Sequence, residues 1–248
     1  MNYLVGDIGN TSTRICILNN NFLIIKSYMF DTHKLVKKKY FKTIFKKLTT
    51  QKLNPNFLFS SVVPVLFNEI KKNFRDTKYK IIEIKDLKIK KIIKIDIKKI
   101  NQLGSDRIVN AIGAKKYKNC LILDFGTATT FDIIKNGVYV GGVIAPGVKL
   151  SMMNLSKSTA LLPMFNLKNN QTSYGKNTKD ALNAGFIWGY EGLINNIISK
   201  ITSKWKIKFN IILTGGYASF FKRFIKKKTI IDQNITIKGI SRVYRELI

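Results

Sequence analysis

The chain has few of the residues on which several common catalytic and structural sites depend. Its 248 residues include one histidine, two cysteines and four prolines. With His33 as the single histidine, there is no Ser/His/Asp triad elsewhere and no histidine-based zinc site. The two cysteines, Cys16 and Cys120, lie in apolar, strand-like stretches. They indicate buried thiols and a cytoplasmic, reducing compartment.

Long apolar runs and the common nucleotide-binding motifs are also missing. No apolar run reaches the ~18 residues of a membrane-spanning helix, and the N-terminal residues form a strand pattern without a signal-peptide layout, so we expect no membrane partner. Neither Gly-x-x-x-x-Gly-Lys-Ser/Thr nor Gly-x-Gly-x-x-Gly occurs, which excludes P-loop and Rossmann sites. Hydrophobic residues make up 45% of the chain, enough for one large globular domain or two smaller ones.

Acidic residues are scarce: 14 Asp and Glu stand against 44 Lys and Arg, a formal net charge of +30. Such a charge raises nucleic acid as a partner. The excess is mostly Lys, is spread along the whole chain and accompanies many Ile, Asn and Phe residues, which AT-rich codons encode, whereas bidentate recognition of phosphates and bases favours Arg. We therefore interpret the charge as AT-rich codon usage and expect no specific nucleic-acid partner.

Two stretches far apart in the chain share one layout. An apolar strand ends at Asp7 and leads into Gly9 and hydroxyl residues; a second ends at Asp124 and leads into Gly126 and Thr127. Glycine lets backbone N–H groups approach phosphate oxygens, and hydroxyls donate hydrogen bonds to them. The carboxylates would act through a cation or bound water. The repeat predicts two related halves that face each other across a cleft.

Hydrophobic periodicity places helices and strands in an order of three strands followed by alternating helices and strands, repeated twice. We expect strands at 3–7, 13–18, 22–27, 57–63, 79–84, 120–124, 129–135, 138–144, 208–213 and 229–232. We expect helices at 31–50, 64–74, 105–117, 148–159, 178–203, 217–224 and from 240 to the end, with Thr178 capping the long helix. No Pro/Ser-rich linker separates the two parts of the chain. We divide the chain into halves 1–110 and 111–248, and the second half carries a broadly apolar helix suited to dimerisation.

The segment Gly104–Arg107 carries adjacent opposite charges at a predicted helix N-terminus. In a structural interpretation, Asp106 is a favourable helix N-terminal charge paired with Arg107, worth ~0.3–1 kcal/mol. In a functional interpretation, Asp106 accepts a hydroxyl proton while Arg107 binds an anionic carboxylate. The four residues alone leave both interpretations open.

The motifs taken together resemble type III pantothenate kinases, enzymes of coenzyme A synthesis, over nearly the whole chain. The motifs that carry the resemblance are Asp7-Ile-Gly-Asn-Thr11, Ser60-Ser-Val-Val-Pro64, Gly104-Ser-Asp-Arg107, Asp124-Phe-Gly-Thr-Ala-Thr-Thr130, Gly141-Gly-Val-Ile-Ala-Pro-Gly147, Gly175-Lys-Asn-Thr178 and Thr214-Gly-Gly216. The resemblance implies an α/β fold with two similar halves of the acetate and sugar kinase/Hsp70/actin (ribonuclease H-like) type around a nucleotide cleft. It also implies Mg-ATP-dependent phosphorylation of pantothenate to 4′-phosphopantothenate, a homodimer, and a monovalent cation, potassium or ammonium.

The resemblance further implies roles for individual residues. Asp106 matches the proton acceptor, and Asp124 matches the ligand of the monovalent cation. The implied ATP-binding residues are Asp7, Ile8, Gly9, Asn10, Thr11, Ser12, Thr13, Arg14 and Thr127. The implied pantothenate-binding residues are Gly104, Ser105, Asp106, Arg107 and Thr178.

One position departs from the family pattern: Ile97, seven residues before Gly104, stands where a substrate-contacting Tyr is usual. This substitution affects the expected pantothenate pocket and with it the substrate affinity. Two alternatives stay open at this point. One is a kinase or phosphatase of the same fold for another small hydroxyl substrate, and the other is a non-catalytic, regulator-like relative.

Overall fold

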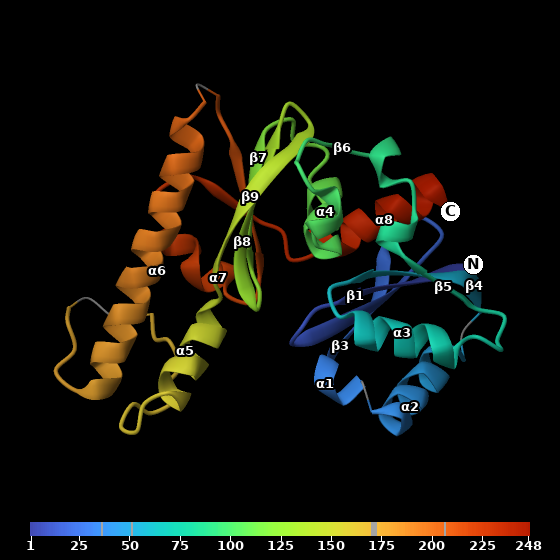
Figure 1. Ribbon diagram of the computed structural model, residues 1–248, viewed down its shortest axis with the longest axis horizontal. Coiled ribbons are helices and arrows are strands. Elements are labelled where there is room, and N and C mark those ends of the chain that lie inside the picture. Colours follow the sequence, from blue (N-terminus) through green and yellow to red (C-terminus); the bar gives the residue numbers. More distant parts are fainter. Residues whose placement is uncertain (36, 51, 170–172, 206) are drawn as a thin grey trace. The chain divides into compact units, whose positions relative to one another are not determined.

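The computed structural model describes residues 1–248 except 36, 51, 170–172 and 206 (Figure 1). The chain forms two compact units. Unit 1 comprises Met1–Lys116, Gly137–Val140 and Asn234–Ile248, and unit 2 comprises Tyr117–Asn136 and Gly141–Gln233. The units are defined by which residues pack together, and the C-terminal segment therefore belongs to unit 1. The division of the sequence into related halves at 1–110 and 111–248 is a different statement and remains a prediction.

Unit 1 is built on a mixed sheet with the order β3-β2-β1-β4-β5. Strands β1, β2 and β3 are antiparallel neighbours, whereas β4 and β5 run parallel to β1. The parallel strands need helical crossovers, and the alternation of helices and strands after β3 supplies them. The strands are β1 Asn2–Ile8, β2 Ser12–Leu18, β3 Ile24–Asp31, β4 Leu53–Ser61 and β5 Lys80–Glu83.

Unit 2 repeats this topology with β9-β8-β7-β10-β11. Strand β8 is antiparallel to β7, and β10 and β11 run parallel to it. The same strand order in both units confirms the predicted α/β fold with two similar halves. The strands are β7 Cys120–Phe125, β8 Ala128–Lys135, β9 Val138–Pro146, β10 Asn210–Gly215 and β11 Thr229–Ile231; the start of β9, up to Val140, is grouped with unit 1.

Helices pack on both faces of the sheet in unit 1. Helices α1, α2 and α3 share a hydrophobic core with β1, β2 and β4, while α8 packs on α4 and against β1 and β4 (Figure 1). The helices of this unit are α1 Thr32–Leu35, α2 Lys38–Leu48, α3 Pro64–Asn73, α4 Ser105–Gly113 and α8 Ile235–Leu247. A short strand, β6 Lys94–Ile95, pairs with Val138 and Tyr139 at the start of β9.

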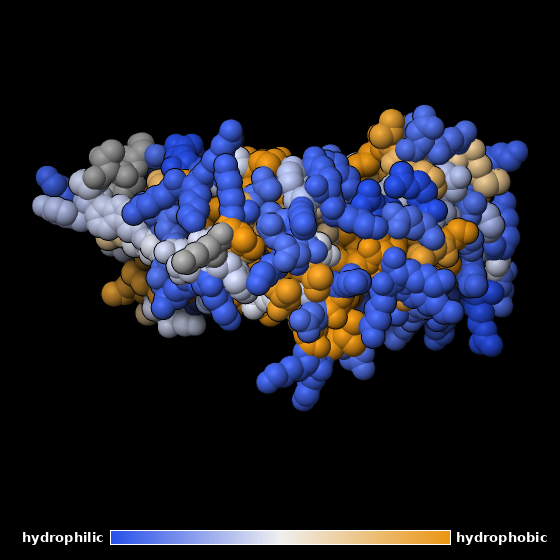
Figure 2. Space-filling model, turned by 90° about the horizontal axis from the view of Figure 1, so that it is seen from above, coloured by the Kyte–Doolittle hydropathy of each residue, from blue (hydrophilic) through white to orange (hydrophobic). Residues whose placement is uncertain are grey.

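Unit 2 carries α5 Val148–Lys157, α6 Thr178–Ser203 and α7 Ala218–Phe221. No helix in the part of the chain that the structure describes is long and apolar enough to cross a membrane. Cys16 and Cys120 are both buried and free, as predicted. Figure 2 shows one face of the molecule, where hydrophilic side chains predominate and hydrophobic ones gather in separate patches.

Several predicted boundaries were wrong for identifiable reasons. The predicted helix 31–50 is two helices, α1 and α2, with residue 36 outside the described part. Strand β4 begins at Leu53 and includes Pro55, because the β1–β4 register shifts between Asn2 and Leu4 and an irregularity of this kind tolerates proline. The C-terminal helix begins at Ile235, not 240, and contains Gly239. A Cβ on Gly239 would overlap the Val109 carbonyl of α4, so this glycine permits close helix packing.

Candidate active site

The first Asp-x-Gly turn joins β1 to β2 in unit 1. In the sheet register, Asp7 stands opposite Arg14 of β2 and beside Ser60 of β4. The turn is closed by the Gly9 N–H, which donates to the Ser12 carbonyl at 3.0 Å. The Ser60 hydroxyl is fully buried beside this turn and has no hydrogen-bond partner among the described residues.

Hydroxyl groups beneath this turn hold its backbone in place. Thr13 is fully buried, and its hydroxyl lies 2.9 Å from the hydroxyl of Thr32, which donates to the Gly9 carbonyl at 2.7 Å. Ile8 is also fully buried. Of the predicted ATP-binding residues, Ile8 and Thr13 therefore turn their side chains into the core, whereas Asn10, Thr11 and Ser12 are exposed. Sequence reasoning missed Thr32, 19 residues beyond Thr13.

Arg14 is held along the sheet by two hydrogen bonds of its guanidinium. Its Nε donates to Ser27 Oγ at 3.0 Å, and its Nη2 donates to Asn234 Oδ1 at 2.7 Å. Asn234 directly precedes α8, so this arginine also connects the start of the C-terminal helix to β2.

The N-terminus of α4 presents the Gly104–Arg107 motif. Asp106 is partly buried, and its Oδ1 accepts a hydrogen bond from the Arg107 N–H at 2.8 Å. Burial raises the pKa of the Asp106 carboxyl, while its hydrogen bonds and the positive charges of Arg107 and Lys85 partly oppose this rise. A Cβ on Gly104 would overlap Asp106 Oδ1, so glycine is needed there for this carboxylate orientation. A carboxylate with a raised pKa can accept a proton near neutral pH.

Arg107 lies over an aromatic ring in the same unit. Its guanidinium carbon is 6.0 Å from the centre of the Tyr139 ring, at the distance of a weak cation–π contact. Tyr139 is held by β6, since Ile95 is its register partner and the Asp96 N–H donates to its carbonyl at 2.8 Å. Sequence reasoning missed Tyr139 because it lies on β9, distant in the sequence from Arg107 on α4.

The second Asp-x-Gly turn joins β7 to β8 in unit 2. In register, Asp124 stands opposite Thr130 of β8 and beside Thr214 of β10. The turn is closed by the Gly126 N–H, which donates to the Ala128 carbonyl at 3.1 Å. Gly215 has a φ of +86° and lies so near the Asp124 carboxylate that a side chain would collide with it.

Thr127, the predicted ATP contact of this turn, is supported by the junction between β9 and α5. The backbone of Gly147 lies against the Thr127 carbonyl, and a Cβ at Gly147 would overlap that oxygen. Glycine at 147 and 215 therefore permits close approach of neighbouring segments to the second turn, which the sequence analysis did not predict.

Oxygen atoms surround both turns. Asp124 has threonine hydroxyls on either side in the register, and Asp7 has the Ser60 hydroxyl. Hard cations such as Mg²⁺ prefer carboxylate, hydroxyl and carbonyl oxygens, so these donors fit such an ion. No group of three or more His, Cys, Asp or Glu side chains positioned to hold a metal occurs within the described residues. A cation at either turn would therefore take further ligands from phosphates or water.

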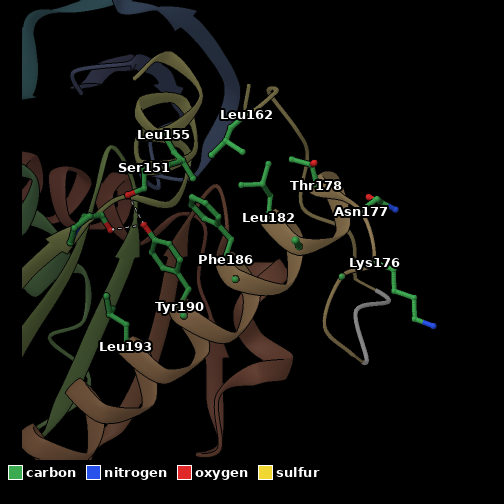
Figure 3. A pocket seen from close by; sticks show the side chains of 15 residues that line it. Ser151, Leu155, Leu162, Lys176, Asn177, Thr178, Leu182, Phe186, Tyr190 and Leu193 are labelled. Atoms are coloured by element: carbon green, nitrogen blue, oxygen red, sulfur yellow. Dashed lines mark hydrogen bonds between the residues drawn. The ribbon is translucent and has the colours of Figure 1, made fainter. Parts of the chain in front are cut away.

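Thr178 is the first residue of α6, and the residue before it caps the helix. The prediction that Thr178 caps α6 was wrong: Asn177 is the N-cap, and its Oδ1 accepts a hydrogen bond from the Asp180 N–H at 3.0 Å. Thr178 instead lies at one end of an apolar cavity of about 950 Å³ between α5 and α6 (Figure 3). Leu155, Leu182 and Phe186 point into this cavity.

The structure thus groups the predicted residues unit by unit. The turn Asp7–Arg14 and the motif Gly104–Arg107 belong to unit 1, where Val62, the residue after β4, connects them: its N–H donates to the Ile8 carbonyl and its side chain lies next to Gly104. Asp124, Thr127 and Thr178 belong to unit 2.

Comparisons with known proteins identify the family of the chain. A family model described as type III pantothenate kinase matches residues 3–200. A type III pantothenate kinase of Pelagibacter ubique is 46% identical over 241 residues, which cover 96% of this chain and 97% of that protein. One from a Sulfurihydrogenibium species is 34% identical, with the same coverage.

Two solved structures show the same fold. A conserved putative Baf family transcriptional activator from Campylobacter jejuni superposes with a TM-score of 0.64 at 21% identity, over 98% of each chain. A putative N-acetylmannosamine kinase from Listeria monocytogenes superposes with a TM-score of 0.56 at 14% identity, over 99% of each chain. These likenesses support the sugar-kinase-type fold, and the sequence relatives add the family. The chain belongs to the type III pantothenate kinase family.

Proposed function

We propose that this protein transfers the γ-phosphoryl group of ATP to the primary hydroxyl of pantothenate, forming 4′-phosphopantothenate. The observation that carries the proposal is the 46% identity to a type III pantothenate kinase over nearly the whole chain. The comparisons give no support to a non-catalytic relative or to another hydroxyl substrate. A kinase uses ATP together with a divalent metal ion that neutralises the phosphate charge.

Asp106 is the proposed proton acceptor. Its carboxylate stands at the N-terminus of α4, partly buried and with a raised pKa, which suits a group that takes the proton of the attacking hydroxyl. Arg107, whose guanidinium lies over Tyr139, carries the positive charge that would bind an anionic part of the substrate. Gly104 and Ser105 are further proposed pantothenate contacts in unit 1; the Ser105 hydroxyl is buried, so its proposed contact is through the backbone. Thr178, in unit 2, is proposed as a pantothenate contact from the family resemblance alone.

The two turns are the proposed phosphate sites. Backbone N–H groups and exposed hydroxyls at 9–12, with Thr127 of the second turn, would bind ATP phosphate oxygens. Asp124 is the proposed ligand of a monovalent cation, potassium or ammonium, with the neighbouring threonine oxygens as further ligands. Bound there, such a cation would supply positive charge that offsets the negative charge of the phosphates.

A homodimer with its contact along α6 is the proposed assembly. Ala181, Gly185 and Gly189 follow one another at four-residue spacing beside the apolar cavity, and Trp188 is 46% exposed on the same helix. Small residues let a second helix approach closely, and an exposed apolar face favours association. The molar mass measured by light scattering should fall from that of a dimer to that of a monomer in Gly189→Arg. An unchanged mass would contradict this contact. The two reduced cysteines also lead us to propose a cytoplasmic location.

The central test is Asp106→Asn in a coupled assay of pantothenate-dependent ADP formation. Loss of the proton acceptor should reduce kcat by ~10²-fold or more, because Asn has a similar shape but cannot take the proton. Asp76→Asn, an exposed carboxylate of the same unit, is the matched control and should retain full activity. Near-normal turnover by Asp106→Asn would contradict the assignment, and turnover independent of pantothenate in the unsubstituted protein would contradict the function.

A further inference from the structure

One glutamate side chain connects the N-terminus of α4 to the sheet of unit 1. Glu83 is the last residue of β5. Its Oε1 accepts a hydrogen bond from the hydroxyl of Ser105, the first residue of α4, and its Oε2 accepts one from the backbone N–H of Lys85. Burial raises the pKa of the Glu83 carboxyl, and its bonds from Ser105 and Lys85 together with the nearby backbone of Ser61, at the end of β4, partly oppose this rise. Glu83 therefore joins β5 to α4 beside the end of β4 through a single group.

The first turn of α4 depends on this contact because its N-cap offers no side chain. Gly104 occupies the N-cap, and no side chain makes a capping hydrogen bond there. Ser105 is completely buried, so its hydroxyl needs a partner inside the protein, and Glu83 provides it. The carboxylate also stands near the positive end of the α4 dipole, where a negative charge is favourable.

The position of Ser105 determines that of Asp106, the next residue. The Asp106 carboxylate lies against the Cα of Gly104 and accepts the Arg107 N–H, so a rotation of the first helical turn would move it. Ser61, which lies beside the Glu83 carboxylate, precedes Val62, whose N–H donates to the Ile8 carbonyl at the first phosphate turn. Glu83 thus lies between the proposed base and the β1–β2 turn: it bonds to Ser105 on one side and lies beside Ser61 on the other.

We propose that Glu83 is a positioning residue for phosphoryl transfer, which holds Ser105 so that the Asp106 carboxylate keeps the orientation in which it accepts the proton of the substrate hydroxyl. This inference rests on the role of Asp106 proposed above. Displacing a catalytic group by ~1 Å can cost up to ~10²-fold in rate, whereas contacts with ATP phosphates elsewhere are unaffected. The effect is therefore expected in kcat and not in the KM for ATP.

The experiment is a double-mutant cycle with Glu83→Ala, Ser105→Ala and the double variant, with Glu69→Ala as control. Glu69 is a partly buried glutamate of α3 in the same unit, so the control removes the same charge and side chain. We expect kcat to fall ~10-fold or more in Glu83→Ala and less in Ser105→Ala, with the double variant no slower than Glu83→Ala, because both substitutions remove one contact. The KM for ATP should stay within ~2-fold in all four.

Additive losses in the double variant, an equal loss in Glu69→Ala, or full turnover by Glu83→Ala would each overturn the positioning role. If circular dichroism shows that Glu83→Ala is unfolded, the kcat of Ser105→Ala alone tests the proposal. An unchanged kcat in Ser105→Ala would then overturn it. Failure of the proposed function is distinguishable, because it would be absence of pantothenate-dependent turnover in the unsubstituted protein. Inactive Asp106→Asn together with fully active Glu83→Ala would refute the role of Glu83 alone.

Discussion

The two Asp-x-Gly turns occupy equivalent places in two sheets of the same topology, yet their neighbours differ. Asp7 has Arg14 opposite it and Ser60 beside it, whereas Asp124 has threonines at both places. The turns also differ in support. Hydroxyl groups hold the first from beneath, whereas closely approaching glycine backbones support the second.

Under the roles proposed above, this difference would suit the two turns to different ligands. Arg14 stands opposite Asp7 in the register, with its guanidinium bonded to Ser27 and Asn234, and its positive charge would favour phosphate oxygens at the first turn. The threonine hydroxyls beside Asp124 would add oxygen ligands to the proposed cation without adding positive charge. The shared strand order puts both carboxylates at equivalent positions of their sheets. Under the proposed roles, the residues beside them on adjacent strands would determine which ligand each can bind.

The largest expected effect tests this division of tasks through Asp7→Asn and Asp124→Asn. Each should lower kcat by ~10²-fold, the size expected when one preorganised charged group at a phosphoryl-transfer site is lost. Only Asp124→Asn should also abolish activation by potassium, measured as kcat against KCl at constant ionic strength. Potassium activation that survives in Asp124→Asn but disappears in Asp7→Asn would reverse the assignment.

A smaller effect is expected from the glycine support of the second turn. Gly147→Ala places a methyl group against the Thr127 carbonyl and should reduce the free energy of unfolding by about 1–3 kcal/mol, with a raised KM for ATP. Gly126→Ala, in the turn itself, is the matched control, because its Cβ would meet neighbours only at ordinary contact distances of 3.5 Å and beyond. Urea unfolding measures the free energy of unfolding of both variants, and the coupled assay measures their KM for ATP. Equal destabilisation of the two variants would show that Gly147 has no special role.

The smallest effect concerns pH and distinguishes the proposed proton acceptor of unit 1 from the proposed cation ligand of unit 2. Burial raises the pKa of Asp106 above its value in the unfolded chain, so its contribution to stability is complete below about pH 4 and is lost as the pH rises through the folded-state pKa. Asp106→Asn should therefore have a higher Tm than the unsubstituted protein at pH 7, and the difference should disappear near pH 4.

The same titration should appear in the kinetics. The acid limb of kcat/KM should lie above the ordinary aspartate range in the unsubstituted protein, and Asp124→Asn should keep this limb at the same pH despite its lower rate. An acid limb that moves in Asp124→Asn would assign the titrating group to unit 2 instead.

Local sequence patterns predicted most of the fold and the motifs of the candidate site. The strand endings at Asp7 and Asp124, the hairpin at Asn136-Gly137 and the helix after Pro64 follow from residues adjacent in the chain. Thr13 shows the limit of such patterns: it was grouped with the ATP contacts, but its alternation along β2 turns it into the core, where it meets Thr32.

Gly239 and Pro55 illustrate the same limit in the fold. Read locally, glycine weakens a helix and proline weakens a strand. In the structure, Gly239 lets α8 pack on α4, and Pro55 lies beside an irregularity in the β1–β4 register. Both residues are explained by a neighbouring element far away in the sequence, which periodicity within one segment cannot reveal.

The sequence by itself therefore determined the order of elements, the two turns and the family, because each depends on residues within a few positions of one another. Only the tertiary structure decided which residues flank each carboxylate and what holds the proposed base. Ser105 and Glu83 are 22 positions apart, and Arg107 of α4 contacts Tyr139 of β9, a strand of a different segment. Contacts of this kind form when strands and helices from distant segments pack, so their chemistry is set by the fold and not by any local motif.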